Sequence, residues 1–298
     1  VQLRWSASGS RCAQHSSASN GAAAPTAGIG SALGSMLSVD LIPPRVGAPD
    51  PRVEKMSGRT SQHKQDAWVD STLKLMRNGF VVESGAYNGL HYSNSLFFEV
   101  ARGWDCLLVE ANPALQADIL ALNRRCTLLR GGLSTTTRPG TFNFTMAGAL
   151  GGIVDAMGAK ERAHAAGAVR QQRAFARGAA GTGATVVVRC YPLHEVLLHG
   201  GVRRADGAGA VTTVDYWSLD TEGSEPDILN ATDFGVIEVG LLTVEHNGRD
   251  VARRRIRHIL EAAGFVRARA TLQDDFYAGR RYFAARGWTL PGSRTLGR

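Results

Sequence analysis

The chain has 298 residues, of which 44% are hydrophobic and 20% are charged. This is enough apolar material for one globular domain with a sizeable core. The longest apolar stretch, residues 234–244, includes Glu238 and is shorter than the roughly 20 residues that a membrane-spanning helix needs. We therefore expect a soluble protein without a transmembrane segment.

The formal net charge of +8 raises the question of a nucleic-acid partner. The basic residues are spread along the chain, however, and no motif of interleaved aromatic and basic residues is present. We expect a generally cationic surface and do not favour nucleic acid as the partner. An acidic substrate or an anionic membrane surface stays open.

Residues 1–60 are rich in Ala, Ser, Gly and Pro, and the first acidic residue is Asp40. This composition predicts disorder, but Arg4 and Arg11 in an acid-poor context also fit an organelle-targeting segment; both interpretations stay open, and the compartment with them. Residues 61–287 are predicted to form the main domain and residues 288–298 a tail. Residues 147–184 form a low-complexity insertion, either a lid or a loop without function.

Strands and helices alternate from Gln65 onwards. Helical spacing of apolar residues is found over 66–78, 91–102 and 114–125, and short apolar strands are predicted at 80–84, 106–110 and 126–134. Asn112 and Pro113 are typical of a helix N-terminus. This alternation predicts right-handed βαβ units and therefore a parallel sheet.

The alternation stops after residue 134 and later resumes. Residues 141–146 and 185–193 are predicted as edge strands that flank the insertion. Residues 214–225 are predicted as a strand running into a loop, 239–248 as a buried strand, and 251–265 as an amphipathic helix. A closing pair of strands is expected over 265–272 and 274–285.

Two glycines follow the first predicted strand, which ends at Glu83. Gly85 and Gly89 bracket a tight turn into the next helix. Ligands of open α/β sheets bind at the carboxyl ends of the strands, and glycine lets a ligand approach the backbone closely. The spacing G-x-x-x-G does not match the G-x-G-x-x-G cradle of a pyrophosphate, so a ligand without phosphates is favoured. An ordinary glycine-rich turn is the alternative.

An acidic residue, Glu110, ends the second predicted strand. It lies roughly 20 residues beyond the glycine turn, where a carboxylate holds the hydroxyls of a nucleoside ribose in α/β folds. A solvated carboxylate at a strand end is the alternative. Taken together with the glycine turn, Glu110 is predicted to bind a ribose.

Further polar residues follow the later strands. Asp220 and Glu222 could hold a cationic group or accept a proton from a hydroxyl, although Ser224 and Asp227 suggest that this segment merely caps a helix. His246 is a candidate base at the next strand end, with a purely structural histidine as the alternative.

His91 is a weaker candidate base. The cysteines at positions 12, 106, 126 and 190 lack metal-ligand spacing, so no metal is expected; Cys106 and Cys126 are predicted to be buried thiols, and a disulfide stays open.

The segments VVESGAYNG, LLVEANP, SLDTEGSE and VEHNG occur in an order and spacing that resembles the FkbM-type S-adenosylmethionine-dependent methyltransferases, from about Gln65 to Phe283. The resemblance implies a Rossmann-like seven-stranded methyltransferase sheet, mostly parallel with the last strand antiparallel, and helices on both faces. It implies S-adenosylmethionine as the cofactor, its methionine part at the glycine turn, its ribose on Glu110 and its adenine near Asn112, Leu133 and Ser134. The cofactor-binding residues so expected are Glu83, Gly85, Ala86, Tyr87, Gly89, Glu110, Asn112, Leu133, Ser134 and Asp220.

The expected reaction is in-line methyl transfer to a hydroxyl of a sugar or other small molecule, with Asp220, His246 or Glu222 as catalytic residues and without a metal. The sequence does not indicate an oligomeric state. One alternative is a non-catalytic Star-like interaction protein that keeps the fold, although that branch carries a membrane anchor. A second is an RNA methyltransferase that uses the basic surface. A nicotinamide-dependent oxidoreductase is disfavoured because the third glycine and a tyrosine–lysine pair are missing.

Overall fold

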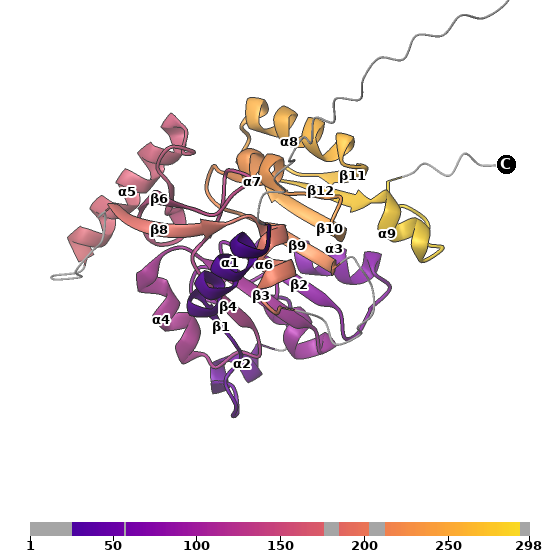
Figure 1. Ribbon diagram of the computed structural model, residues 1–298, viewed down its shortest axis with the longest axis horizontal. Helices are drawn as coiled ribbons and strands as arrows, with labels where there is room; N and C mark the ends of the chain where they lie inside the picture. Colours follow the sequence, from indigo (N-terminus) through magenta and orange to yellow (C-terminus); the bar gives the residue numbers. More distant parts are fainter. Residues whose placement is uncertain (1–25, 57, 176–184, 203–211, 293–298) are drawn as a thin grey trace, which may run out of the picture.

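The computed structural model describes residues 26–56, 58–175, 185–202 and 212–292. Its larger sheet has eight strands in the order β1-β4-β3-β2-β9-β10-β12-β11 (Figure 1). The strands in that order are Leu41–Ile42, Thr127–Arg130, Asp105–Glu110, Phe80–Ser84, Thr212–Leu219, Ile237–Glu245, Asp274–Gly279 and Phe265–Ala270. The pairings from β4 through β10 are parallel, whereas those that β1, β12 and β11 make are antiparallel.

The predicted α/β fold is confirmed, but the predicted strand number is wrong. The sheet has eight strands rather than seven because the N-terminal segment adds β1, which pairs antiparallel with β4. The last strand in the chain, β12, runs antiparallel between β10 and β11. The sheet is therefore mixed at both edges around a parallel centre of five strands.

The segment predicted to be disordered or targeting includes ordered structure. Residues 1–25 lie outside the described residues, but α1 (Thr26–Asp40), β1 and α2 (Pro51–Lys55) follow. Leu33, Leu37 and Leu41 are spaced by four residues and are buried in the main core. Asp40 accepts hydrogen bonds from Nε of Arg189 at 2.6 Å and from the hydroxyl of Tyr191 at 2.6 Å. These contacts fasten α1 to the domain.

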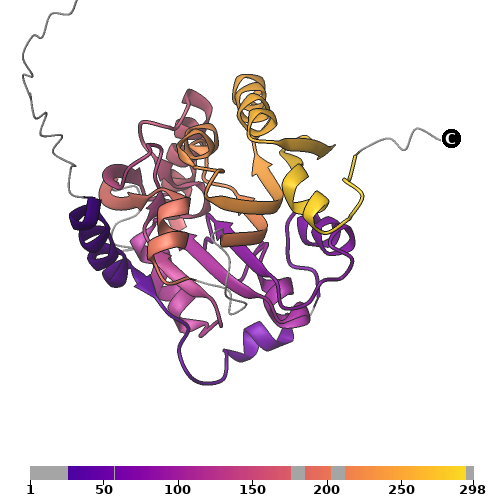
Figure 2. The same cartoon turned by 45° about the vertical axis from the view of Figure 1, so that its right-hand side comes forward.

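Helices cover both faces of the sheet, since alternate strand residues point to opposite sides. Val82 and Leu107 belong to one hydrophobic core, and Val81 and Leu108 to the other. The first core is covered by α1, α6 (Leu193–His199), α7 (Glu225–Ala231) and α8 (Asp250–Ala262); the second by α3 (Gln65–Thr72), the π-helix η1 (Phe98–Arg102), α4 (Pro113–Ala121) and α9 (Arg280–Ala285). Figure 2 shows α1 in indigo and α9 in yellow on opposite sides of the strands.

A second, four-stranded sheet lies beside the first, in the order β5-β8-β6-β7. It consists of Gly132–Leu133, Thr185–Tyr191, Gly140–Thr145 and Gly152–Ile153, and with it go the 3-10 helix η2 (Gly148–Leu150) and α5 (Ala159–Phe175). The two segments predicted as edge strands thus pair with each other, antiparallel, rather than with the main sheet. Figure 1 shows β6, β8 and α5 to one side of the main sheet.

The insertion predicted over 147–184 supplies η2, β7 and α5, while its residues 176–184 lie outside the described part of the chain. Among the described residues, no helix is both long enough and apolar enough to cross a membrane.

Replacing Leu37 tests whether α1 belongs to the folded domain. Leu37 is fully buried, so Leu37→Ala should lower the free energy of unfolding by about 2–5 kcal/mol, measured by urea denaturation. The neighbouring Met36 is 41% exposed, and Met36→Ala should change that free energy by less than about 0.5 kcal/mol. Equal stability of the two variants would show that α1 does not pack on the sheet.

Candidate functional site

A cavity of about 390 Å³ lies at the carboxyl ends of the central parallel strands. From β2 the chain winds outward through β3 to β4, and from β9 it continues in the other direction to β10, so the strand order reverses between β2 and β9. In open α/β sheets a crevice forms at this reversal, because neighbouring connections leave toward opposite faces. Gly85, Glu110, Asp220 and Glu245, which end or follow β2, β3, β9 and β10, line the cavity.

Gly85 lies where the ends of β2 and β9 come together. The backbone N–H of Asp220 donates to the carbonyl oxygen of Ser84 at 3.1 Å. A Cβ on Gly85 would lie 1.7 Å from the carbonyl oxygen of Asp220, and its φ of +85° is also unfavourable for other residues. Glycine is therefore required at this position by the adjacent strand end, in addition to the tight turn and the close ligand approach expected from the sequence.

Glu110 is buried at the end of β3, and its carboxylate is fixed by the backbone. Oε2 accepts a hydrogen bond from the N–H of Tyr87 and Oε1 from the N–H of Asn112, both at 2.8 Å. Burial raises the pKa of Glu110 to about 7, although these two hydrogen bonds lower it; the charge of Glu83 adds to the rise. The carboxylate thus faces the cavity in a fixed orientation and changes charge near neutral pH.

The residues expected to bind a cofactor divide into two groups. Seven of them line the cavity: Glu83, Gly85, Ala86, Tyr87, Glu110, Leu133 and Asp220. The other three, Gly89, Asn112 and Ser134, do not line the cavity. Gly89 lies against α4, where a Cβ would contact Ile119 and Leu122, and the side chain of Asn112 caps α4. The hydroxyl of Ser134 donates to the carbonyl oxygen of Arg138 at 2.9 Å.

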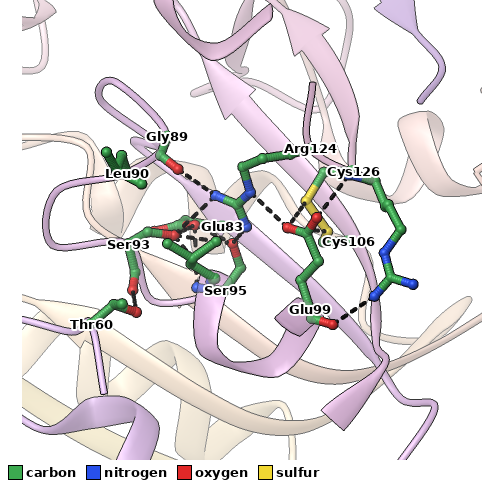
Figure 3. Close-up of polar contacts among 12 residues, drawn as sticks. Thr60, Glu83, Gly89, Leu90, Ser93, Ser95, Glu99, Cys106, Arg124 and Cys126 are labelled. Atoms are coloured by element: carbon green, nitrogen blue, oxygen red, sulfur yellow. Dashed lines mark hydrogen bonds and ion pairs between the residues drawn. A yellow bond between two sulfur atoms is a disulfide. The ribbon is translucent and has the colours of Figure 1, made fainter. Parts of the chain in front are cut away.

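Glu83, which lines the cavity, belongs to a buried polar network (Figure 3). Its carboxylate accepts hydrogen bonds from Oγ of Ser93 at 2.8 Å, from the N–H of Asn94 at 2.6 Å and from the hydroxyl of Ser95. Arg124 donates to both serines, at 3.1 and 2.8 Å. The carboxylate of Glu83 is therefore held in place by hydrogen bonds from residues 93–95.

The same arginine extends the network to a disulfide. Nε of Arg124 contacts Oε2 of Glu99 at 2.7 Å, and this oxygen lies 3.3 Å from Sγ of Cys126. Cys106 and Cys126 form a disulfide rather than the predicted free thiols. In the disulfide neither sulfur carries a hydrogen that it could donate. Neither sulfur is a thiolate, the form of cysteine that binds a metal. The register of β3 and β4 explains the pairing, because Leu107 lies opposite Thr127, one residue beyond each cysteine.

Asp220, Glu222 and Glu245 form a carboxylate cluster on the other side of the cavity, with ligand oxygens within 4.8 Å of one another. Burial raises the pKa of Asp220 to about 7 despite a hydrogen bond with Glu245, and burial together with the charge of Asp220 raises that of Glu222 to about 8. The pKa of Glu245 is raised well above its usual range, again chiefly by burial. Three acidic groups thus share a small volume.

The turn that carries Asp220 and Glu222 is fixed by the next helix. Oε1 of Glu225 accepts hydrogen bonds from the N–H groups of Thr221 at 2.9 Å and Gly223 at 3.0 Å. Ser224 occupies the N-cap position of α7 but makes no side-chain capping bond there. The alternative in which this segment only caps a helix therefore does not account for the cluster.

His246 lies outside the cavity. Its Nδ1 accepts a hydrogen bond from the N–H of Gly248 at 3.1 Å, and its Nε2 lies 3.7 Å from Oδ1 of Asp275. The ring is buried, and Asp275 in turn pairs with Arg253 at 2.7 Å. His246 follows Glu245 directly, so the two side chains point to different sides of the strand end. His91, the weaker candidate, does line the cavity.

Several cavity residues were missed by sequence analysis. Oδ1 of Asn94 is buried and has no hydrogen-bond partner among the described residues. Asp274 begins β12 and accepts a hydrogen bond from Nε2 of Gln65 at 3.0 Å. Lys160 reaches the cavity from α5. In a parallel sheet, site residues are sought at the carboxyl ends of the strands. Asp274 could not be found in this way, because β12 is antiparallel and its amino end lies at this edge of the sheet.

The fold and cavity define a class: an α/β protein with a cavity at the reversal point of a mixed sheet. The model of the methyltransferase FkbM domain matches residues 83–267, and the chain belongs to that family. The resemblance found in the sequence is thereby confirmed, and the protein is of the methyltransferase class. No curated protein matches the sequence.

Two solved structures resemble the chain only weakly. One is the precorrin-6y C5,15-methyltransferase from Geobacter metallireducens, with 11% identity over 76% of this chain and 95% of its own, at a TM-score of 0.35. The other is a putative RNA methyltransferase from Pyrococcus horikoshii, with 10% identity over 84% and 98%, also at 0.35. These likenesses are too weak to support a conclusion about function.

Replacing Arg124 tests the network behind the cavity. Arg124→Met should lower the free energy of unfolding by about 3–5 kcal/mol, because it leaves Glu99 buried without its partner. The control is Arg257→Met, whose pair with Glu261 is about half exposed and should contribute less than about 1 kcal/mol. Urea denaturation of both variants measures the difference, and equal losses would contradict this role of Arg124.

Proposed function

We propose that the chain is an S-adenosylmethionine-dependent methyltransferase that methylates a hydroxyl of a sugar or other small molecule. The observation that carries the proposal is the carboxylate of Glu110. Each of its oxygens accepts one backbone hydrogen bond and keeps lone-pair capacity for a second. Two such oxygens, side by side in a cavity at the reversal point, suit the two hydroxyls of a ribose.

The other cavity residues fit the rest of this group. Strands lie about 4.8 Å apart, so the ends of β3 and β9 are separated by roughly 10 Å, a span suited to an adenosyl and methionine moiety. The unpartnered Oδ1 of Asn94 can accept a hydrogen bond from an ammonium group. When bound, the group supplies a methyl on a sulfonium, and the carboxylates at Asp220 and Glu222 favour positive charge nearby.

The chain itself contributes orientation and proton transfer. Glu110 and the turn at Gly85 fix the donor, while Asp220 and Glu222 line the wall where an acceptor hydroxyl would lie. Their pKa values of about 7 and 8 suit a base that works near neutral pH. His246 has no part in this proposal because it does not face the cavity.

Binding measurements test the proposal. Isothermal titration should give binding of S-adenosylmethionine and S-adenosylhomocysteine but not of NAD, and Glu110→Ala should weaken the binding at least tenfold, as expected for two lost hydrogen bonds to a charged group. Asp118 is exposed on the neighbouring helix α4, and Asp118→Ala serves as the control with unchanged affinity. Folded protein that binds neither sulfur nucleoside would refute the proposal.

The charge of Glu110 predicts how binding depends on pH. The ribose hydroxyls donate to the ionised carboxylate, so affinity for S-adenosylhomocysteine should rise with pH up to about 7 and level off above it. One pH unit below the pKa about a tenth of the carboxylates are ionised, so affinity at pH 6 should be roughly tenfold below the plateau. Glu110→Gln should flatten this part of the profile. A profile that is the same in both proteins would assign the titration to another group.

A further inference from the structure

The carboxylate cluster is assembled from two neighbouring strand ends and the turn between β9 and α7. In the parallel register Leu219 lies opposite Val244, so Asp220 and Glu245 are the next residues on the two strands. Glu222 joins them from the turn, where it has a φ of +56°. Oxygens from all three side chains lie within 4.8 Å of one another, close enough for the three side chains to reach one cation.

One of these oxygens lacks a partner. Oε2 of Glu245 is buried in the cavity wall and accepts no hydrogen bond from any described residue. A buried carboxylate oxygen is normally paired, which makes this one an indication of a missing positive group.

The nearby basic side chains are engaged elsewhere. Arg249 pairs with Glu161 at 3.1 Å and with Glu225 at 2.9 Å. Nζ of Lys160 donates to the carbonyl oxygen of Asn247 at 3.1 Å. Within the described part of the chain, the cluster therefore gathers more negative charge than these cations offset.

We propose that Asp220, Glu222 and Glu245 bind one hard divalent cation, of the Mg²⁺ or Mn²⁺ type. All three side chains offer oxygen, the donor that such ions prefer, and none of the three offers nitrogen or sulfur. Three carboxylate ligands would leave coordination positions free on an octahedral ion, and all three residues line the cavity. This proposal departs from the expectation from the sequence that no metal is bound.

A cation at this position would select a class of acceptor substrate. This inference rests on the proposed function. A hydroxyl oxygen of the acceptor would occupy a free position on the ion, which would lower the pKa of that hydroxyl. Its proton would pass to water while the oxygen takes the methyl group from the sulfonium. Asp220 and Glu222 then act through the ion instead of as bases. Acceptors with two adjacent oxygens are favoured, because they can fill two free positions at once.

The test uses the full chain and MnCl₂ as the probe, without any nucleoside. The six-line electron paramagnetic resonance signal of free Mn²⁺ should decrease on addition of wild-type protein, and MgCl₂ should restore it by competition. Glu245→Gln keeps the side chain's shape and should weaken Mn²⁺ binding at least tenfold while leaving S-adenosylhomocysteine affinity within about threefold. Glu110→Gln is the matched control, because Glu110 lies in the same cavity but three strands away, roughly 14 Å at strand spacing. This variant should weaken S-adenosylhomocysteine binding and leave Mn²⁺ binding unchanged.

The outcomes separate the two proposals. Loss of Mn²⁺ binding in Glu245→Gln alone, with nucleoside binding lost in Glu110→Gln alone, supports both. Nucleoside binding without any Mn²⁺ binding at millimolar concentration overturns the cation site and leaves the proposed function standing. Mn²⁺ binding that both variants weaken equally also overturns the cation site, since it reflects only the general negative charge of the cavity.

Discussion

The parallel pairing of β2 with β9 is the constraint on which the site depends. It joins the two halves of the sheet at the point where the winding direction reverses, and so it opens a crevice above the strand ends. The contact is so close at its carboxyl end that Gly85 cannot carry a side chain beside Asp220. One backbone contact therefore sets the distance between the wall that holds Glu110 and the wall that holds the carboxylate cluster.

Charge is distributed unevenly between the surface and the cavity. The chain carries a formal charge of +8, but six acidic residues line the cavity: Glu83, Glu110, Asp220, Glu222, Glu245 and Asp274. Such a cavity repels phosphates and attracts cationic ligands. Overall charge describes the surface of this protein, whereas the carboxylates that line the cavity determine the chemistry available there.

The parts of the fold that follow local rules were predictable. Glu83, Gly85 and Glu110 were located because they end, or directly follow, apolar strands of a parallel sheet, and strand ends meet at one edge. The family follows from four such segments in order. Asp220 was found in the same way.

Features that depend on long-range pairing were not predictable in this way. The disulfide depends on the register of β3 against β4, and Asp274 reaches the cavity only because β12 inserts antiparallel. The helix α1 was hidden by the composition of residues 1–60, although Leu33 and Leu37 already have helical spacing. His246 was expected in the cavity but lies outside it. Successive residues at a strand end point to opposite sides, so a difference of one position decides whether a side chain faces the cavity.

In the proposed function, the cavity at the reversal point holds an adenosyl group by its ribose. A crystal structure of the chain with S-adenosylhomocysteine tests this binding mode. Both ribose hydroxyls are expected within hydrogen-bond distance of the two oxygens of Glu110, with the sulfur between the glycine turn and Asp220. A nucleoside bound elsewhere, or a ribose that points away from Glu110, would contradict it.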